Sequence, residues 1–287
     1  MIYLLLCIII WASSFIVGKS ATSELDPVLL VQIRLMIGAL IVLPIFLPAY
    51  RRIPTGKQPM VWLLSFLTLP VCFVLQFMGL SMTSASSAIA ILGLNPLLSV
   101  LVGHFCFGLR ARMMDFVLSI VAFVGIFMMI FAAKGSGQIS LLGCLLVMLG
   151  CLSFILCMFV SKSIIAQMPS QAYTTVSIVF GAISCLPLTV IFAKQWQLPT
   201  TTTALSSVLY LGVVCSYLAM VFWNKGLAKS NAVIAGFLLA LEPVIGLVMA
   251  MIAFGDSLPW LSWLGIALVI GSALCSVGIP ASNSAKP

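Results

Sequence analysis

The sequence predicts an all-α polytopic membrane protein whose ten transmembrane helices form two inverted five-helix repeats. Three observations predict this fold class: the composition, a series of ten apolar stretches, and a match of the chain to itself at half its length. Of the 287 residues, 63% are hydrophobic and only 6% are charged, and the mean hydropathy is +1.30. Because a soluble domain carries about 25% charged residues, this composition excludes a water-soluble enzyme. A disordered chain is also excluded, since it would need far lower hydrophobicity.

Ten apolar stretches are each close to the length of about 20 residues that crosses a bilayer core of about 30 Å. The first lacks the basic segment that opens a secretory signal peptide, so we interpret it as a retained helix, with a cleaved signal peptide as the alternative. The connections are short and leave no room for a soluble domain. The ten stretches cover 2–18, 27–49, 60–80, 84–108, 113–132, 139–161, 170–192, 204–224, 231–254 and 258–278.

The basic residues predict the direction of the spans. An even number of spans places both termini on one side, and cytoplasmic loops carry an excess of Lys and Arg. With cytoplasmic termini, most of the basic residues fall inside, and only Lys19, Lys134 and Lys194 fall outside. We therefore expect a multi-pass protein of the plasma membrane, specifically a bacterial inner membrane, with both termini in the cytoplasm. The inside set is Arg51, Arg52, Lys57, Arg110, Arg112, Lys162, Lys225, Lys229 and Lys286.

Other classes of function find little support. The formal net charge is +8, but the basic residues stand singly or in pairs, so no nucleic-acid partner is expected. The nine cysteines all lie in apolar stretches, with no CxxC motif and a single histidine, which argues against a disulfide framework and a metal site. No nucleophile elbow or phosphate-binding loop occurs. We expect no cofactor and no catalytic residues.

An internal repeat appears when the chain is aligned with itself. At an offset of 143 residues, Pro27 to Pro44 aligns with Ser170 to Pro187, and Trp11 falls on Phe154. At an offset of 147, Asn95-Pro96 falls on Glu242-Pro243. Because each copy holds five spans, an odd number, the second copy must enter the membrane upside down. Inverted repeats of this kind are typical of secondary transporters, which bind substrate near the midplane between the copies.

The order of motifs resembles the drug/metabolite transporter superfamily, and within it the EamA type with two five-helix repeats. The motifs are Trp11-Ala12-Ser13-Ser14-Phe15, Arg34 followed by Gly38, Asn95-Pro96, Trp223-Asn224-Lys225-Gly226-Leu227 and Leu241-Glu242-Pro243-Val244. The resemblance implies repeats at 1–133 and 139–278, followed by a short cytoplasmic tail at 279–287. It also implies a secondary transporter that works by alternating access and exports small metabolites such as amino acids. Finally, it implies a cavity walled by the first, third, fourth, sixth, eighth and ninth spans.

Two ionisable residues inside the spans are candidates for substrate binding, because charges at membrane depth are costly. Glu242 lies about 16 Å into the ninth span at the helical rise of 1.5 Å per residue. Its carboxyl group can carry a proton or bind a substrate ammonium, and the alternative is a structural acid hydrogen-bonded to a neighbouring helix. Arg34 lies about 10 Å into the second span. Its guanidinium either reaches outward to Glu24 and Asp26 or holds a substrate carboxylate.

Further candidates are neutral or aromatic. Asn95 is the repeat counterpart of Glu242 and can hydrogen-bond substrate at the matching depth. The remaining candidates for the cavity wall are Trp11, Ser14, Gln76, Trp223 and Asn224, each of which can instead serve helix packing or anchoring. His104 is a second candidate for proton coupling, with a neutral structural histidine as the alternative.

The expected partners are a small-molecule substrate and the lipid bilayer, with a homodimer left open. Two other functions stay open at this point: a membrane-embedded lipid-modifying enzyme, and a non-transporting assembly subunit of a membrane complex. An enzyme should show clustered acids or histidines, whereas the five acids and one histidine are widely spread. An assembly subunit has no need of an inverted duplication. The sequence therefore favours transport.

Overall fold

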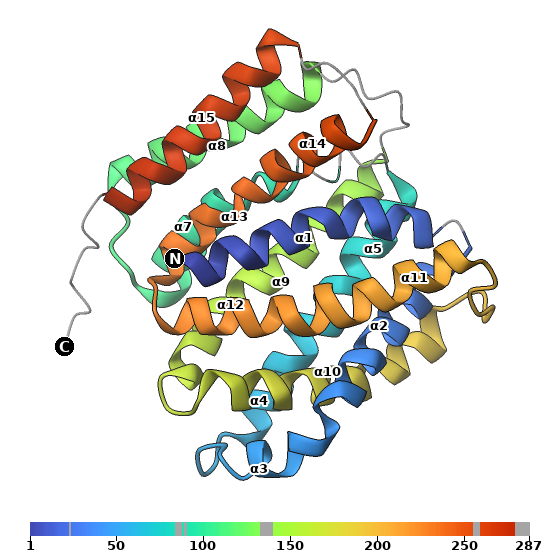
Figure 1. Ribbon diagram of the computed structural model, residues 1–287. Coiled ribbons are helices and arrows are strands. Elements are labelled where there is room, and N and C mark those ends of the chain that lie inside the picture. Colours follow the sequence, from blue (N-terminus) through green and yellow to red (C-terminus); the bar gives the residue numbers. More distant parts are fainter. Residues whose placement is uncertain (23, 84–87, 89–90, 133–139, 255–258, 279–287) are drawn as a thin grey trace.

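The computed structural model describes residues 1–22, 24–83, 88, 91–132, 140–254 and 259–278. Within these ranges all regular elements are helices, packed side by side in a bundle (Figure 1). Five apolar helical segments are long enough to cross a membrane: Pro27–Tyr50, Gln58–Met82, Leu141–Ile165, Ser170–Phe192 and Thr202–Ala228. Shorter apolar helices cover Ile2–Gly18, Asn95–Phe107, Met113–Met128, Ala232–Gly246 and Trp260–Ser276. These segments follow the predicted spans, so the all-helical membrane fold is confirmed.

The helices of the two halves correspond in order. In the first half they are α1 (Ile2–Ala21), α2 (Pro27–Val42), η1 (Leu43–Ile45), α3 (Phe46–Tyr50), α4 (Gln58–Phe66), η2 (Leu67–Val71), α5 (Cys72–Met82), α7 (Asn95–Phe107) and α8 (Met113–Ala132). In the second half they are α9 (Leu141–Ile165), α10 (Ser170–Phe192), α11 (Thr202–Tyr210), η3 (Leu211–Leu218), α12 (Ala219–Ala228), α13 (Ala232–Leu239), α14 (Leu241–Phe254) and α15 (Trp260–Gly278). The predicted tail at 279–287 lies outside the described residues.

Local signals in the sequence set several helix boundaries. Asp26 caps α2, because its carboxylate accepts hydrogen bonds from the backbone N–H of Val28 and Leu29, and Pro27 occupies the first helical position. At the other end of a span, Gly108 stops α7 in the left-handed conformation with φ of 64°. These caps lie at the ends of spans, where backbone groups would otherwise lack partners.

The packing of the helices is preserved when the two halves are exchanged. Helices α2 and α10 pack together, as do α8 and α15, and these pairs are repeat counterparts. The contact of α5 with α9 matches the contact of α12 with α1, and the contact of α7 with α9 matches that of α14 with α1. In Figure 1, α8 and α15 lie side by side at one edge of the bundle, next to α13 and α14. This pattern supports the inverted repeat.

Two spans contain π-helical turns at corresponding positions. Segment η2 interrupts the third span around Pro70, which has no N–H to donate, and η3 interrupts the eighth span. The loosened backbone leaves carbonyl groups for side chains of other helices. The Leu67 carbonyl accepts a hydrogen bond from Ser153 Oγ at 2.9 Å, and the Cys215 carbonyl accepts one from Trp11 Nε1 at 3.1 Å. Such π-turns occur often at functional sites.

The fourth and ninth spans are broken near their middle, again at corresponding positions. A turn at Gly93 and Leu94 precedes α7, which begins at Asn95. In the ninth span, Ala240 separates α13 from α14, and Glu242 lies in the first turn of α14. Broken helices at membrane depth are tolerated where they line a cavity. The breaks therefore place Asn95 and Glu242 where a binding site is expected.

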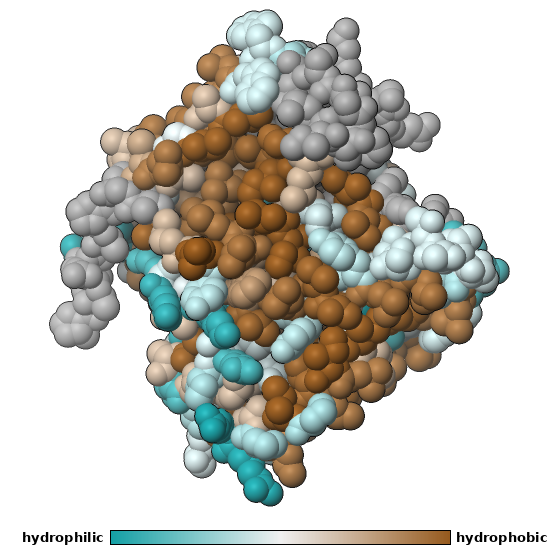
Figure 2. All heavy atoms as spheres, viewed as in Figure 1, coloured by the Kyte–Doolittle hydropathy of each residue, from teal (hydrophilic) through white to brown (hydrophobic). Residues whose placement is uncertain are grey.

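The surface matches a protein surrounded by lipid. Figure 2 shows a broad apolar face over the middle of the bundle, with the most hydrophilic atoms along one edge. In the same view α1 begins and α15 ends on that side of the bundle (Figure 1). Large apolar side chains such as Leu40, Val190 and Ile191 are more than 60% exposed. Burying this surface in hydrocarbon stabilises the protein in a membrane.

Candidate functional site

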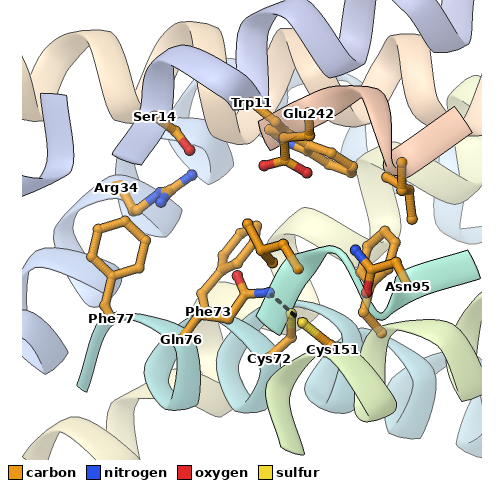
Figure 3. A pocket seen from close by; sticks show the side chains of 13 residues that line it. Trp11, Ser14, Arg34, Cys72, Phe73, Gln76, Phe77, Asn95, Cys151 and Glu242 are labelled. Atoms are coloured by element: carbon orange, nitrogen blue, oxygen red, sulfur yellow. Dashed lines mark hydrogen bonds between the residues drawn. The ribbon is translucent and has the colours of Figure 1, made fainter. Parts of the chain in front are cut away.

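A cavity lies among six spans near the helix breaks, and Figure 3 shows it from close by. Its empty volume, which includes space open to the outside of the protein, is about 510 Å³. Its walls come from the first, second, third, fourth, sixth and ninth spans. The expectation of the eighth span in this wall was wrong for the described residues, because Arg34 of the second span takes part instead. The lining residues are Trp11, Ser14, Arg34, Cys72, Phe73, Gln76, Phe77, Leu92, Asn95, Cys151, Phe154, Leu239 and Glu242. We call this space the central cavity.

Arg34 contributes a buried cation to the central cavity. Its side chain is 1% exposed, and its Nε donates a hydrogen bond to Ser216 Oγ at 2.7 Å. The guanidinium carbon lies 4.5 Å from the centre of the Phe73 ring and 5.3 Å from that of Phe77. These contacts fix the guanidinium plane without neutralising its charge. Among the described residues, no hydrogen bond or ion pair engages its terminal nitrogens, which leaves them open to a ligand.

The Arg34 side chain does not extend outward to Glu24 and Asp26, the two acids near the start of the second span. Asp26 caps α2 and also accepts a hydrogen bond from the backbone N–H of Lys194 at 2.9 Å. Glu24 Oε1 accepts a hydrogen bond from Thr201 Oγ1 at 2.5 Å. In Figure 3, the Arg34 side chain instead points into the cavity beside Ser14. The structure therefore places the guanidinium in the inward position of the two that the sequence left open.

Glu242 contributes a buried carboxyl group to the same cavity. Its side chain is 7% exposed, and its carboxyl group points into the space beside Trp11 (Figure 3). Within the described part of the chain, no hydrogen bond or ion pair joins this carboxyl group to another residue. Its position in the first turn of α14 is favourable for negative charge, because the helix N-terminus carries positive potential. The structural alternative, a bond to a neighbouring helix, is not observed.

The wall between these two groups is polar but neutral. The amide oxygen of Asn95 is buried and has no hydrogen-bond partner among the described residues. Gln76 Nε2 donates to the sulfur of Cys151 at 3.9 Å, a weak contact that a ligand can replace. Both amides therefore offer unused hydrogen-bonding capacity at the depth of the helix breaks.

Three aromatic rings from three helices close one end of the central cavity. The ring centres of Trp11, Phe154 and Trp223 lie 5.2 to 5.5 Å apart in all three pairings. Trp11 comes from α1, Phe154 from α9 and Trp223 from α12. We call this cluster the ring trio. It places the predicted residue Trp223 against the cavity's end, although Trp223 does not line the cavity itself.

The remaining candidates from the sequence lie elsewhere. Asn224 lines a second cavity beyond the ring trio, together with Trp223. His104 is exposed near the end of α7, where its Nδ1 lies 3.0 Å from the Leu109 carbonyl oxygen, and it borders a separate pocket with Asp115. The structure thus brings together Trp11, Ser14, Arg34, Gln76, Asn95 and Glu242, and leaves Trp223, Asn224 and His104 outside the central cavity.

Several lining residues escaped prediction because they are apolar or sulfur-containing. Cys72, Phe73, Gln76 and Phe77 recur on one face of α5 at helical spacing. For Cys72, Phe73 and Phe77, this helical spacing relative to Gln76 was the only signal in the sequence. For Cys151 the sequence offers no comparable signal, because its small side chain resembles the other apolar residues of its span.

Comparisons with known proteins agree with this architecture. A relative from Haemophilus influenzae, named an uncharacterized transporter, is 40% identical over 141 residues, covering 48% of this chain and 83% of its own. A probable amino-acid metabolite efflux pump from Salmonella typhimurium is 23% identical over 284 residues, covering 95% of this chain and 93% of its own. A solved structure with 19% identity matches with a TM-score of 0.77 over 96% of this chain and 95% of that one, which supports the fold.

A match to a family model shows to which protein family the chain belongs. The model described as the EamA-like transporter family matches residues 1–131 and again residues 141–278. The two matches together span most of the chain, and each covers one set of five predicted spans. The chain therefore belongs to the EamA-like transporter family and is a multi-pass membrane transporter.

Proposed function

We propose that this protein is a secondary transporter of small zwitterionic metabolites, with amino acids as the expected class and export as the expected direction. One observation carries the proposal: Arg34 and Glu242, with opposite charges, line the same cavity, and neither has an ionic partner among the described residues. A zwitterion presents a carboxylate and an ammonium. Arg34 holds the carboxylate, and Glu242 receives the ammonium.

The energetic argument is that buried charges call for partners. A charge at the centre of a membrane costs about 2.5–3.5 kcal/mol on insertion scales, and truncating one partner of a buried pair leaves the other uncompensated. A zwitterion in the central cavity would supply both missing partners at once. A ligand with a single charge would leave either Arg34 or Glu242 uncompensated, so the cavity discriminates by charge pattern.

Proton coupling follows from the same arrangement. Glu242 is the acidic residue of the cavity wall, because its repeat counterpart is the neutral Asn95. The other groups in the wall that can ionise are Arg34, Cys72 and Cys151. Glu242 can hold either a proton or the substrate ammonium, so that each displaces the other. A gradient of protons would then drive export.

Orientation and mechanism complete the proposal. Cytoplasmic termini in a bacterial inner membrane are supported by the excess of Lys and Arg in the loops on that side. Alternating access between the two halves is supported by their exchangeable packing. The names of the relatives support transport over a lipid-modifying enzyme or an assembly subunit.

The test is transport by the purified protein in proteoliposomes. The panel contains amino acids together with the matching amines, which lack the carboxylate, and the matching acids, which lack the ammonium. We expect movement of zwitterions that depends on a pH gradient, and little movement of either singly charged analogue. Equal transport of an amino acid and its amine would overturn the role of Arg34, and no transport of any zwitterion would overturn the proposal.

A further inference from the structure

A second cavity lies on the far side of the ring trio from the central cavity. Its empty volume, which includes space open to the outside of the protein, is about 290 Å³, and Phe154 borders both cavities. No charged residue lines it within the part of the chain that the structure describes. Its walls are Thr68, Phe154, Met158, Ser161, Tyr173, Ser177, Met220, Trp223 and Asn224. We call it the second cavity.

The repeat relates five residues of the central cavity to five residues of the second cavity. Residues of the central cavity on α1, α2 and α5 have their counterparts, at offsets of 143 or 147, in residues of the second cavity on α9, α10 and α12. The pairs are Trp11 with Phe154, Arg34 with Ser177, Phe73 with Met220, Gln76 with Trp223, and Phe77 with Asn224. Five of the nine residues that line the second cavity are therefore repeat counterparts of central-cavity residues, whereas α7 and α14 contribute residues to the central cavity alone.

The two cavities lie toward opposite ends of the spans. In the central cavity, Arg34 lies in the first half of the second span (Pro27–Tyr50), and Phe77 lies toward the end of the third span (Gln58–Met82). In the second cavity, Ser177 lies in the first half of the seventh span (Ser170–Phe192), and Asn224 lies toward the end of the eighth span (Thr202–Ala228). Because the second repeat is inverted, the start of α10 and the start of α2 lie on opposite faces of the membrane. The ring trio separates the two.

The second cavity contains hydroxyl groups that are weakly partnered. Thr68 Oγ1 and Ser177 Oγ are both buried, and among the described residues neither makes a hydrogen bond of ordinary geometry, although Thr68 lies near the Cys157 thiol and Ser177 near the Tyr173 hydroxyl. A buried hydroxyl without a partner costs about 1–3 kcal/mol. Asn224 is oriented by a hydrogen bond from its Nδ2 to Thr174 Oγ1 at 2.9 Å. These groups are arranged for a polar ligand that enters the space.

We infer that the second cavity is a second site for the transported metabolite, reached when the ring trio opens. This inference rests on the proposed transport function. In the opposite state of an inverted-repeat protein, each half adopts the arrangement of the other, so the second cavity would widen as the central cavity contracts. Its hydroxyl and amide groups bind the uncharged polar parts of the metabolite. The second cavity has the neutral Ser177 at the position that corresponds to the cationic Arg34 of the central cavity. The metabolite therefore binds less tightly in the second cavity and is released from it.

The experiment measures from which side each cavity can be reached, and it needs no substrate. The variant Ser177→Cys places a thiol in the second cavity, and Gln76→Cys places one in the central cavity as the matched control. Each variant is labelled with a membrane-impermeant methanethiosulfonate in vesicles of both orientations, and modification is read at that site by mass spectrometry. We expect the thiol at position 177 to react from one side and the thiol at position 76 from the other.

The ring trio is tested in the same assay. Adding Phe154→Ala to Ser177→Cys should allow labelling from both sides, and Phe154→Leu, which keeps most of the apolar volume, should preserve one-sided labelling. Labelling of positions 177 and 76 from the same side, or no labelling at 177 from either side, would overturn the inference. Opposite labelling together with a failed transport panel would refute the zwitterion proposal and leave the second cavity supported.

Discussion

Replacing Glu242 with glutamine tests the carboxyl group at the centre of the protein. Glu242→Gln keeps the size of the side chain and its hydrogen-bonding capacity but removes its charge and its proton. The carboxyl group is 7% exposed and has no partner among the described residues, so the substitution breaks no internal contact and the variant should fold. What it removes is the interaction with the substrate. A hydrogen bond to a charged group contributes about 1.5–3 kcal/mol, which corresponds to binding weaker by about 10- to 150-fold.

The assay is amino-acid transport in proteoliposomes over a range of pH, with equilibrium binding measured on the same preparation. For Glu242→Gln we expect weaker binding of the zwitterion and the loss of acceleration by a pH gradient. The acid that lacks the ammonium should bind the variant and the parent alike. Glu24→Gln is the matched control, because Glu24 lies outside the cavity and the chemical change is identical. If Glu242→Gln transports amino acids with the parent's rate at every pH, the carboxyl group is structural and the reasoning fails.

Three further predictions concern binding, packing and topology. Arg34→Lys loses the planar guanidinium stacked on an aromatic ring, so we expect the KM for zwitterions to rise by about tenfold, with no change in the equilibrium binding of the matching amines. Gly79→Ala places a Cβ 2.6 Å from the backbone oxygen of Gly143. We therefore expect thermal unfolding to show that the variant is less stable by about 1–3 kcal/mol. An unchanged Tm would contradict the close packing of α5 against α9. Cysteine labelling should reach 51–58 from the cytoplasmic side and 20–26 from outside, and labelling of both from one side would refute the topology.

The sequence predicted the spans because apolar length and scattered charge report directly on membrane burial. It also predicted the matching positions of Asn95 and Glu242, since the duplicated Asn-Pro and Glu-Pro pairs mark where the helices break. The π-turns were not predicted. Pro70 was a signal for η2, but nothing in the apolar run of η3 distinguishes a π-turn from a regular helix.

The inward position of Arg34 could not be decided from the sequence. Its rise along the helix gave the depth of the residue, and both directions were open to a long side chain. The deciding contacts are Ser216 and Phe73, which lie 182 and 39 positions along the chain from Arg34. Likewise, Trp223 and Asn224 were expected in one cavity with Trp11, because the ring trio that separates two cavities depends on tertiary packing of three helices.

The backbone follows the symmetry of the inverted repeat, but the charged residues of the central cavity do not. Arg34 has Ser177 as its counterpart, and Glu242 has Asn95, so each of these two charged positions of the central cavity is neutral in the other repeat. Both charges nevertheless line the same cavity, since Arg34 comes from the second span and Glu242 from the break in the ninth. If both repeats carried the charges, the two states would bind a zwitterion equally well, and the ligand would have no preferred side. With the cation present on one side alone, binding is tighter in one state than in the other, and a proton on Glu242 can weaken that binding when release is needed.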